Sequence, residues 1–316
     1  MDKRVFGPVP TRRLGQSLGI DPVPLKTCNW NCVYCQLGRS QPVTNERRVY
    51  FDTEEILSQV RASLAAHPPG QIDWITFVGS GETCLHAEIG ALIRGVKALT
   101  DLPVAVITNG GLLYLPEVRE ALLPADAVLP SLDAGNSDLY HRINRAHRDL
   151  SFERLVEGLI HFRQEYTGQL WIEVMLIRGL NDTEAALKEI AAVLAKINPD
   201  EVHIVTPTRP PVETWVKPPD EDGLLRARAI LGTIAEIVHP ATGAFDLSGK
   251  EDLLEAILGI ITRHPMRDSE LNEALADWPA DEIRSTLTRL EKSGRAKIVE
   301  RQGIRFWRAS ESHFPD

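Results

Sequence analysis

"TCNWNCVYCQLG", residues 27–38, contains three of the chain's four cysteines within eight positions. The three cysteines follow the spacing CxxxCxxC, and a disulfide framework, which needs paired thiols, does not account for them. A structural zinc site takes four ligands. Three thiolates in one loop can instead hold three irons of a cubane iron–sulfur cluster and leave the fourth iron open to a small molecule. The stretch therefore predicts an iron–sulfur site with Cys28, Cys32 and Cys35 as its ligands.

Cys84 is the fourth cysteine, and it stands well away from the other three. Either Cys84 or His86 could complete a zinc site on the three clustered cysteines, which is the alternative to an iron–sulfur cluster. Cys84 could also be a small buried thiol in a loop. As a redox-active or hydrogen-donating thiol it would instead be a catalytic residue. The sequence leaves these alternatives open.

The composition of the 316-residue chain is that of an ordinary globular protein, with 43% hydrophobic and 25% charged residues. The sequence has no apolar run of about 18 residues and no apolar signal segment in residues 1–15. Clustered cysteines outside a disulfide framework indicate a reducing compartment, so we expect a cytoplasmic protein without a membrane partner. The net charge of −9 argues against a broad nucleic-acid surface, although a local basic patch is compatible with it.

Short β-rich runs alternate with helical stretches as far as residue 245. The expected strands are 17–23, 74–82, 103–110, 126–135, 169–182 and 201–208. The expected helices are one that begins at Asp52, followed by 86–99, 116–125, 151–166, 183–197 and 221–238. Nearly continuous apolar strands between amphipathic helices are typical of a parallel sheet covered by helices. About six βα units suit a partial (β/α)6 barrel of the α/β class.

A different pattern follows, and it predicts a small second domain. We expect the barrel to cover residues 1–247 and the second domain to cover 248–316. The expected elements of the second domain are helices at 251–264, 267–275 and 279–294 and two strands in 295–309 that turn at Gln302 and Gly303. Asp268 or Ser269 is the expected N-cap of the second helix, and Gly294 is expected to end the third.

Three helices followed by a hairpin resemble a winged helix, which raises the question of DNA binding. Residues 249–316 contain 11 Lys and Arg against 13 Asp and Glu. Because phosphate neutralisation supplies much of the affinity for DNA, this balance is unfavourable for a DNA-binding domain. We therefore expect the module to cover the barrel, to pair with another subunit or to present a substrate or a partner protein, with nucleic acid as the less favoured partner.

The cysteine spacing in "CNWNCVYC" resembles the signature of the radical S-adenosylmethionine (radical SAM) enzymes, with Tyr34 as the aromatic residue before the last cysteine. The resemblance implies a 4Fe–4S cluster and S-adenosylmethionine (SAM) as cofactors. It implies that one electron cleaves the sulfonium reductively to a 5′-deoxyadenosyl radical, which abstracts hydrogen from the substrate. It also implies a flavodoxin- or ferredoxin-like electron donor. The substrate is an unidentified small molecule or protein.

The stretch "GSGE", residues 79–82, ends the strand that follows the cysteine loop. It resembles the family's glycine-rich segment at the methionine end of SAM. Glycines allow a close approach of the backbone, and the glutamate supplies a carboxylate for a cation. The residues expected to contact the cofactor are therefore Gly79, Ser80, Gly81 and Glu82, together with Tyr34.

Polar side chains also stand at the carboxyl ends of the later strands, where sites form in parallel α/β folds. The resemblance implies cofactor contacts for Asn109, Ser131, Asp133 and Glu173. Asn109 could instead only form a turn before Gly110. Asp133 could instead only cap its own segment.

Four arginines are candidates for binding an anionic group of the substrate: Arg12, Arg13, Arg178 and Arg209. Arg12 and Arg13 precede the cysteine loop and could equally form ion pairs across the mouth of the barrel. Arg178 and Arg209 could equally be surface residues or ion-pair partners.

Longer stretches resemble the branch of the superfamily that is related to wyosine-type tRNA modification enzymes. These stretches are "FGPVPTRRLGQSLGIDPVPLKTCNWNCVYCQLG", "GSGETCLH", "SLDAG" with "INRAH", and "TPTRPP". Wyosine synthases hold a second cluster on three further cysteines, and this chain has only Cys84 beyond the signature. A wyosine-like tRNA-modifying enzyme is therefore the alternative function, and an iron–sulfur DNA-binding regulator is the alternative of another class.

Overall fold

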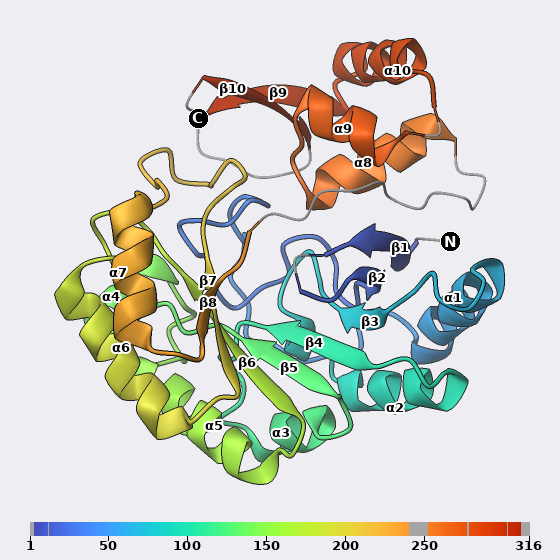
Figure 1. Cartoon of the computed structure of the whole chain (residues 1–316). Helices are drawn as coiled ribbons and strands as arrows, with labels where there is room; N and C mark the ends of the chain where they lie inside the picture. The colour runs from blue at the N-terminus through green and yellow to red at the C-terminus, as the bar shows by residue number, and fades with distance from the viewer. Residues whose placement is uncertain (1–2, 12, 240–251, 277, 302, 311–316) are drawn as a thin grey trace.

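The chain up to residue 239 folds around one sheet of eight strands (Figure 1). The structure is a computed structural model, and it describes residues 3–11, 13–239, 252–276, 278–301 and 303–310. The strands are β1 (Val5–Pro10), β2 (Gln16–Ile20), β3 (Trp74–Phe77), β4 (Val104–Thr108), β5 (Ala127–Pro130), β6 (Gln169–Met175), β7 (Glu201–Val205) and β8 (Ala235–Ile237). The helices are α1 (Thr53–Ala66), η1 (Thr83–Leu85), α2 (Ile89–Leu99), α3 (Pro116–Leu122), α4 (Ser137–Ile143), α5 (Phe152–Glu165), α6 (Glu184–Ile197) and α7 (Glu221–Leu231).

Strands β2 to β8 run parallel, and β1 pairs antiparallel with β2. Their order in the sheet is their order along the chain, with β1 at one end and β8 at the other. Figure 1 shows the helices of this part of the chain around the outside of the curved sheet. The α/β class and the partial barrel are confirmed, and the six expected strands are β2 to β7.

Alternate side chains of each strand face the helices and the interior of the barrel. In β6, Ile172 and Val174 are fully buried in the main hydrophobic core under the helices. Trp171 and Glu173 project from the opposite face of the same strand. Trp171 packs there against Trp74, with 5.9 Å between the ring centroids. The helix-facing residues pack the helices onto the sheet, and the interior face combines apolar side chains such as Trp171 with polar ones such as Glu173.

Several elements differ from those expected from the sequence. The single helix expected over 221–238 is wrong, because α7 ends at Leu231 and β8 follows beside β7. Gly232 ends the helix with φ +95°, which is a conformation that glycine adopts most readily. The expected elements also did not include β1, where Pro8 and Pro10 are unfavourable for a strand, or the short helix α4.

Capping groups fix where several helices begin and end. Asp52 Oδ1 accepts the backbone N–H of Glu55 at 2.9 Å, which confirms Asp52 as the start of α1. The sequence predicts Asp268 or Ser269 as the N-cap of the second C-terminal helix. This prediction is wrong, because Arg267 is the N-cap residue. The backbone N–H of Arg267 donates to Glu270 Oε2 at 2.8 Å. Gly294 follows the third C-terminal helix with φ +73°, as expected.

Residues 252–310 form a second unit of three helices and a hairpin (Figure 1). Its elements are α8 (Leu253–Arg263), α9 (Asp268–Ala274), α10 (Ala280–Lys292), β9 (Ala296–Arg301) and β10 (Ile304–Ala309), with β9 and β10 antiparallel. This unit has its own hydrophobic core, which includes Ile257, Leu287 and Trp307. The expected boundary at 247 and 248, and Gln302 of the expected turn, lie outside the described residues. None of the described helices combines the length and the apolar character that a membrane span requires.

Candidate cofactor site

The cysteine loop connects β2 to α1 at the carboxyl end of the sheet, and Cys28, Cys32 and Cys35 in it are reduced and partly buried. Backbone hydrogen bonds anchor this loop to the segments that follow β5 and β7. They join Asn31 N–H to Asn144 O (3.0 Å), Val33 N–H to Ile143 O (2.9 Å) and Val212 N–H to Cys35 O (3.0 Å). The path of the loop is therefore fixed by parts of the barrel that are distant in the sequence.

Each of the three sulfur atoms faces at least one nitrogen donor. The donors are Trp30 N–H at 3.4 Å and Asn109 Nδ2 at 3.9 Å from Cys28 Sγ, Asn144 Nδ2 at 3.8 Å from Cys32 Sγ, and Lys26 Nζ at 3.1 Å from Cys35 Sγ. N–H donors and a nearby cation stabilise a thiolate, which is the form of cysteine that binds metals. The donor set fits three cysteines that ligate an iron–sulfur cluster.

Burial keeps the thiols of Cys28 and Cys32 protonated as long as no metal is bound. It raises the pKa of Cys28 to about 11, against the opposing charge of Lys26. Burial also raises the pKa of Cys32 well above its ordinary value, and the neighbouring cysteines add to the shift. A bound metal reverses this balance because it stabilises thiolates directly, so metal binding at this site releases protons.

The residues that could have completed a zinc site are engaged elsewhere. His86 Nε2 donates to Phe51 O at 3.0 Å, and its Nδ1 accepts the N–H of Glu88 at 3.2 Å. Burial lowers the pKa of His86, which suits the neutral ring that these two bonds require. Cys84 is fully buried, with its Sγ 3.4 Å from Thr108 Oγ1. Both side chains are held by groups other than the three clustered cysteines, which speaks against the zinc alternative. In the described part of the chain, no group of three or more His, Cys, Asp and Glu is arranged to hold a single metal ion.

The GSGE loop follows β3 and packs directly against the start of the cysteine loop. Ser80 O accepts the N–H of Lys26 at 2.6 Å, and Thr27 O accepts the N–H of Glu82 at 2.8 Å. A Cβ on Gly81 would lie 2.0 Å from Thr27 O, so no larger residue fits without moving the backbone. The two loops are therefore fixed relative to each other by their backbones.

Glu82 is buried as the N-cap of η1, and its carboxylate has three donors. Oε1 accepts from Thr108 Oγ1 at 2.5 Å and from Cys84 N at 2.9 Å, and Oε2 accepts from Asn109 N at 2.7 Å. Burial raises the pKa of Glu82, and these hydrogen bonds oppose the shift. The side chain of Asn109 donates to Asn29 Oδ1 at 2.6 Å, so this residue does more than form a turn. Glu82 and Asn109 together tie the ends of β3 and β4 to the cysteine loop.

Asp133 is buried after β5, and both of its carboxylate oxygens are used. Tyr34 Oη and Asn144 Nδ2 each donate to Oδ2 at 2.6 Å, and the N–H of Met175 donates to Oδ1 at 2.9 Å. Burial nevertheless raises the pKa of Asp133 to about 6. The carboxylate connects the aromatic residue of the cysteine signature to β6. Ser131, two residues earlier, forms a parallel bridge to Glu173.

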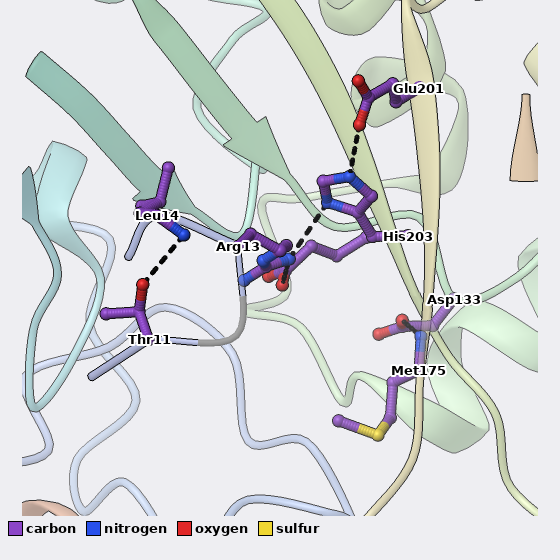
Figure 2. A network of polar contacts seen from close by, with 8 residues as sticks. Thr11, Arg13, Leu14, Asp133, Met175, Glu201 and His203 are labelled. Atoms are coloured by element: carbon purple, nitrogen blue, oxygen red, sulfur yellow. Dashed lines mark hydrogen bonds and ion pairs between the residues drawn. The ribbon is translucent and has the colours of Figure 1, made fainter. Parts of the chain in front are cut away.

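Figure 2 shows a network of polar contacts in which Arg13, His203 and Glu201 lie close together. Arg13 forms an ion pair with Glu173, and its Nη1 lies 3.3 Å from His203 Nδ1. His203 Nε2 lies 2.8 Å from Glu201 Oε2, so the ring donates to Glu201 and presents its lone pair to Arg13. Burial lowers the pKa of His203, in agreement with a neutral ring. Arg13 thus makes the ion pair that was the alternative to a substrate contact, and its partner is a residue expected to contact the cofactor.

The other three arginine candidates have different surroundings. Arg209, in the segment after β7, forms an ion pair with Glu270 of α9. Arg178 is exposed after β6, and its backbone N–H donates to Lys217 O at 2.9 Å. Arg12 lies outside the described residues. The ion pair of Arg209 is again the alternative that the sequence left open.

Sequence reasoning missed three polar residues that hold this site. Asp21 accepts the N–H and the Oγ–H of Ser80, at 3.1 and 2.7 Å. Lys26 and Asn144 lie beside the cysteine sulfurs. Asp21 stands directly after a parallel strand, which is a signal that could have identified it. Lys26 owes its position to a left-handed backbone with φ +60°, and a lysine gives no sequence signal for that conformation.

Comparison with known proteins shows what this chain is similar to. The model of the radical SAM superfamily matches residues 23–204. A UPF0026 protein of Methanocaldococcus jannaschii is 36% identical over 279 residues, which are 85% of each of the two chains. The GTPase Obg of Brachyspira hyodysenteriae is 46% identical over 207 residues, which are 66% of this chain and 30% of that protein.

A solved structure shares the fold. The radical SAM methyltransferase from Sphaerobacter thermophilus superposes with a TM-score of 0.51 and 18% sequence identity, over 70% of this chain and 66% of that chain. At this identity the likeness concerns the fold alone. The match to the superfamily covers more than half of the chain and includes the cysteine loop, the GSGE loop and strands β3 to β6. The chain belongs to the radical SAM superfamily.

Proposed function

We propose that this chain is an enzyme that cleaves SAM reductively and abstracts hydrogen from a small-molecule or protein substrate. Enzymes of the superfamily use a 4Fe–4S cluster and SAM. When bound, these cofactors supply a 5′-deoxyadenosyl radical, because one electron from a flavodoxin- or ferredoxin-like donor splits the sulfonium into methionine and that radical. The observation that carries the proposal is the set of three cysteines whose sulfurs all face nitrogen donors beside the GSGE loop.

The chain's own residues hold the cofactors in this proposal. We assign Cys28, Cys32 and Cys35 as ligands of three irons. Lys26 is the cation beside them, and its ammonium balances part of the negative charge that three thiolates bring into a buried site. The residues assigned to the SAM side of the site are Tyr34, Gly79, Ser80, Gly81, Glu82, Asn109, Ser131, Asp133 and Glu173.

Two of these residues act by positioning. Glu82 and Asp133 are buried, and the carboxylate oxygens of each accept three hydrogen bonds from the chain itself. Glu82 keeps the ends of β3 and β4 together, and Asp133 holds Tyr34 against β6. Their removal would let the loops that bear the cysteines and the GSGE stretch move apart.

We also propose that residues 1–247 and 248–316 are separate domains and that the second is a winged helix. The separate hydrophobic core of residues 253–309 supports this division. All four cysteines are free, which supports a reducing compartment and hence the cytoplasm as the location.

Anaerobic reconstitution with iron and sulfide, followed by incubation with SAM and dithionite, tests the proposed function. We expect about four irons per chain and 5′-deoxyadenosine as a product detected by chromatography. Cys32→Ala should lose both the iron and the product. Cys84→Ala is the matched control for iron content and should keep it, because Cys84 Sγ lies against Thr108. A fully loaded wild type that forms no 5′-deoxyadenosine would overturn the proposal, as would a Cys32→Ala variant that forms it at the wild-type rate.

A further inference from the structure

The C-terminal unit contacts the barrel at residues that border the cofactor site. Arg263, the last residue of α8, forms an ion pair with Asp21, with 3.5 Å between Nε and Oδ2. Gln36 of the cysteine loop donates from Nε2 to Arg263 O at 2.8 Å. Glu270 of α9 forms an ion pair with Arg209. The contacts therefore reach the barrel just after β2, in the cysteine loop and after β7.

Asp21, the partner of Arg263, also forms hydrogen bonds with the GSGE loop. Its side chain is only 2% exposed. Oδ1 accepts the N–H of Ser80 at 3.1 Å, and Oδ2 accepts the Oγ–H of the same residue at 2.7 Å. Ser80 O in turn accepts the N–H of Lys26, two residues before the first cysteine. One buried carboxylate thus orients both loops, and Arg263 of the other unit lies against it.

A carboxylate this deeply buried needs compensating positive charge. Burial raises the pKa of Asp21, and the charge of Arg263 is the largest effect that opposes the shift, with a smaller one from Arg4. Arg263 is held in place because its guanidinium lies over the ring of Phe6, 4.5 Å from the centroid. The arginine therefore has a fixed position between the two units.

A groove of about 850 Å³ lies beside this contact. Residues of β1 and α1 line one wall, and residues of α8 line the other, with Arg263 among them. The polar contacts of Arg263 with Asp21 and Gln36 lie beside this groove and link the two units.

We propose that Arg263 is a positioning residue of the SAM site, so that the C-terminal unit completes the site through Arg263, Asp21 and Ser80. This inference rests on the proposed function, because it takes the GSGE loop as a part of the chain that contacts SAM. Without Arg263, Asp21 loses compensating charge, its bonds to Ser80 weaken, and the GSGE loop becomes free to move. The effect falls on SAM affinity and not on cluster assembly, since the cysteine loop keeps its own anchors.

The test uses the whole chain, both anaerobically reconstituted and metal-free, with five single variants and one double variant. Arg263→Met removes the charge but keeps an unbranched apolar chain over Phe6, and Arg263→Lys restores the charge. Asp21→Asn removes the other end of the ion pair. Arg295→Met is the matched control, because it breaks an exposed ion pair with Glu255 (3.0 Å) within the same unit. The measurements are the dissociation constant for SAM by equilibrium dialysis, the iron content, and hydrogen exchange of residues 79–82 in the metal-free protein.

Arg263→Met should weaken SAM binding about tenfold, the effect of leaving a buried polar group without its partner. Its iron content should stay at the wild-type value, and residues 79–82 should exchange faster. Arg263→Lys should recover most of the affinity, and Arg295→Met should behave as wild type. In the Asp21→Asn background, Arg263→Met should cause little further loss of SAM affinity, because the carboxylate through which Arg263 acts is gone.

Three results would overturn the inference. One is wild-type SAM affinity and wild-type exchange of residues 79–82 in Arg263→Met. Another is a full additional loss of SAM affinity when Arg263→Met is combined with Asp21→Asn. The third is an equal loss of SAM affinity in Glu270→Gln. This result would mean that any weakened contact between the C-terminal unit and the barrel has the same effect. If Arg263→Met unfolds the C-terminal unit, Asp21→Asn tests the same link from the barrel side and should also speed the exchange of residues 79–82.

Failure of the proposed function is recognised separately. A wild type that binds no SAM would refute that function. Hydrogen exchange in the metal-free protein needs neither cofactor. It therefore decides whether Arg263 orders the GSGE loop, whatever the outcome with SAM.

Discussion

At residue 133, a buried carboxylate holds the aromatic residue of the cysteine signature. Burial raises the pKa of Asp133 to about 6, although Tyr34, Asn144 and Met175 all donate to it. In the unfolded chain an aspartate titrates near its ordinary value of about 3.9. Between about pH 4 and about pH 6 the folded protein therefore binds more protons than the unfolded chain. It follows that the contribution of Asp133 to stability is greatest at low pH and falls as the pH rises through this window.

We expect the free energy of unfolding to lose about 3 kcal/mol through Asp133 between about pH 4 and about pH 7. Asp133→Asn removes the titration, so the difference in unfolding free energy between wild type and variant isolates the effect. Denaturant unfolding of both metal-free proteins across this pH range measures that difference. A raised pKa of Asp133 would be contradicted if the difference in unfolding free energy did not change with pH. It would also be contradicted if wild type became more stable relative to Asp133→Asn as the pH rises.

Among the residues of the site, those in a motif could be predicted and those placed by the tertiary fold could not. The three cysteines, Tyr34 and the GSGE stretch are close together in recognisable patterns. Lys26 reaches a sulfur only because its backbone is left-handed. The ion pair of Arg13 with Glu173 joins residues that are 160 positions apart, and no local pattern encodes such a pairing. The ion-pair partner of Asp21, Arg263, belongs to the C-terminal unit.

At the scale of elements, Gly232 decides where α7 ends and β8 can begin. It has φ +95° and ψ −173°, and a Cβ at this position would meet nothing within 4 Å. Gly232→Ala should therefore destabilise the protein through backbone strain alone, by about 1–3 kcal/mol. Gly259→Ala is the matched control, since Gly259 lies inside α8 with equally open surroundings, and it should be neutral or stabilise by about 1 kcal/mol. Denaturant unfolding compares the two variants, and equal effects would show that the conformation at Gly232 is not costly for alanine.

The same elements show which parts of the fold the sequence could predict. Strands β3, β4 and β5 are apolar on nearly every residue because they are buried, and this makes them recognisable. Residues 233–238, "TIAEIV", continue the apolar spacing of α7, and only their pairing with β7 makes three of them a strand. In β1 the sequence "VFGPVP" contains a glycine and two prolines, which are unfavourable for a strand, but an edge strand tolerates proline.

At the scale of the whole molecule, the described residues form two main hydrophobic cores and a small third cluster in the barrel. The barrel core runs from Val5 to Ala235, and the C-terminal core runs from Leu253 to Ala309. Polar contacts of Arg263, Gln36 and Glu270 join the units at the rim of the cofactor site. Two cores with such a connection should unfold as two cooperative units, although the smaller one supports a loop of the larger one.

Truncating one leucine in each core tests this organisation. Leu287 in α10 is 3% exposed and Leu187 in α6 is fully buried, so replacing either by alanine should cost about 2–5 kcal/mol. In Leu287→Ala, hydrogen exchange should accelerate in residues 253–309 and, through Arg263, in residues 79–82, while β4 to β7 keep their protection. Leu187→Ala should instead accelerate exchange in the barrel and leave the C-terminal hairpin protected. Uniform acceleration along the chain in both variants would mean one cooperative unit, and unchanged exchange at 79–82 in Leu287→Ala would separate the C-terminal unit from the cofactor site.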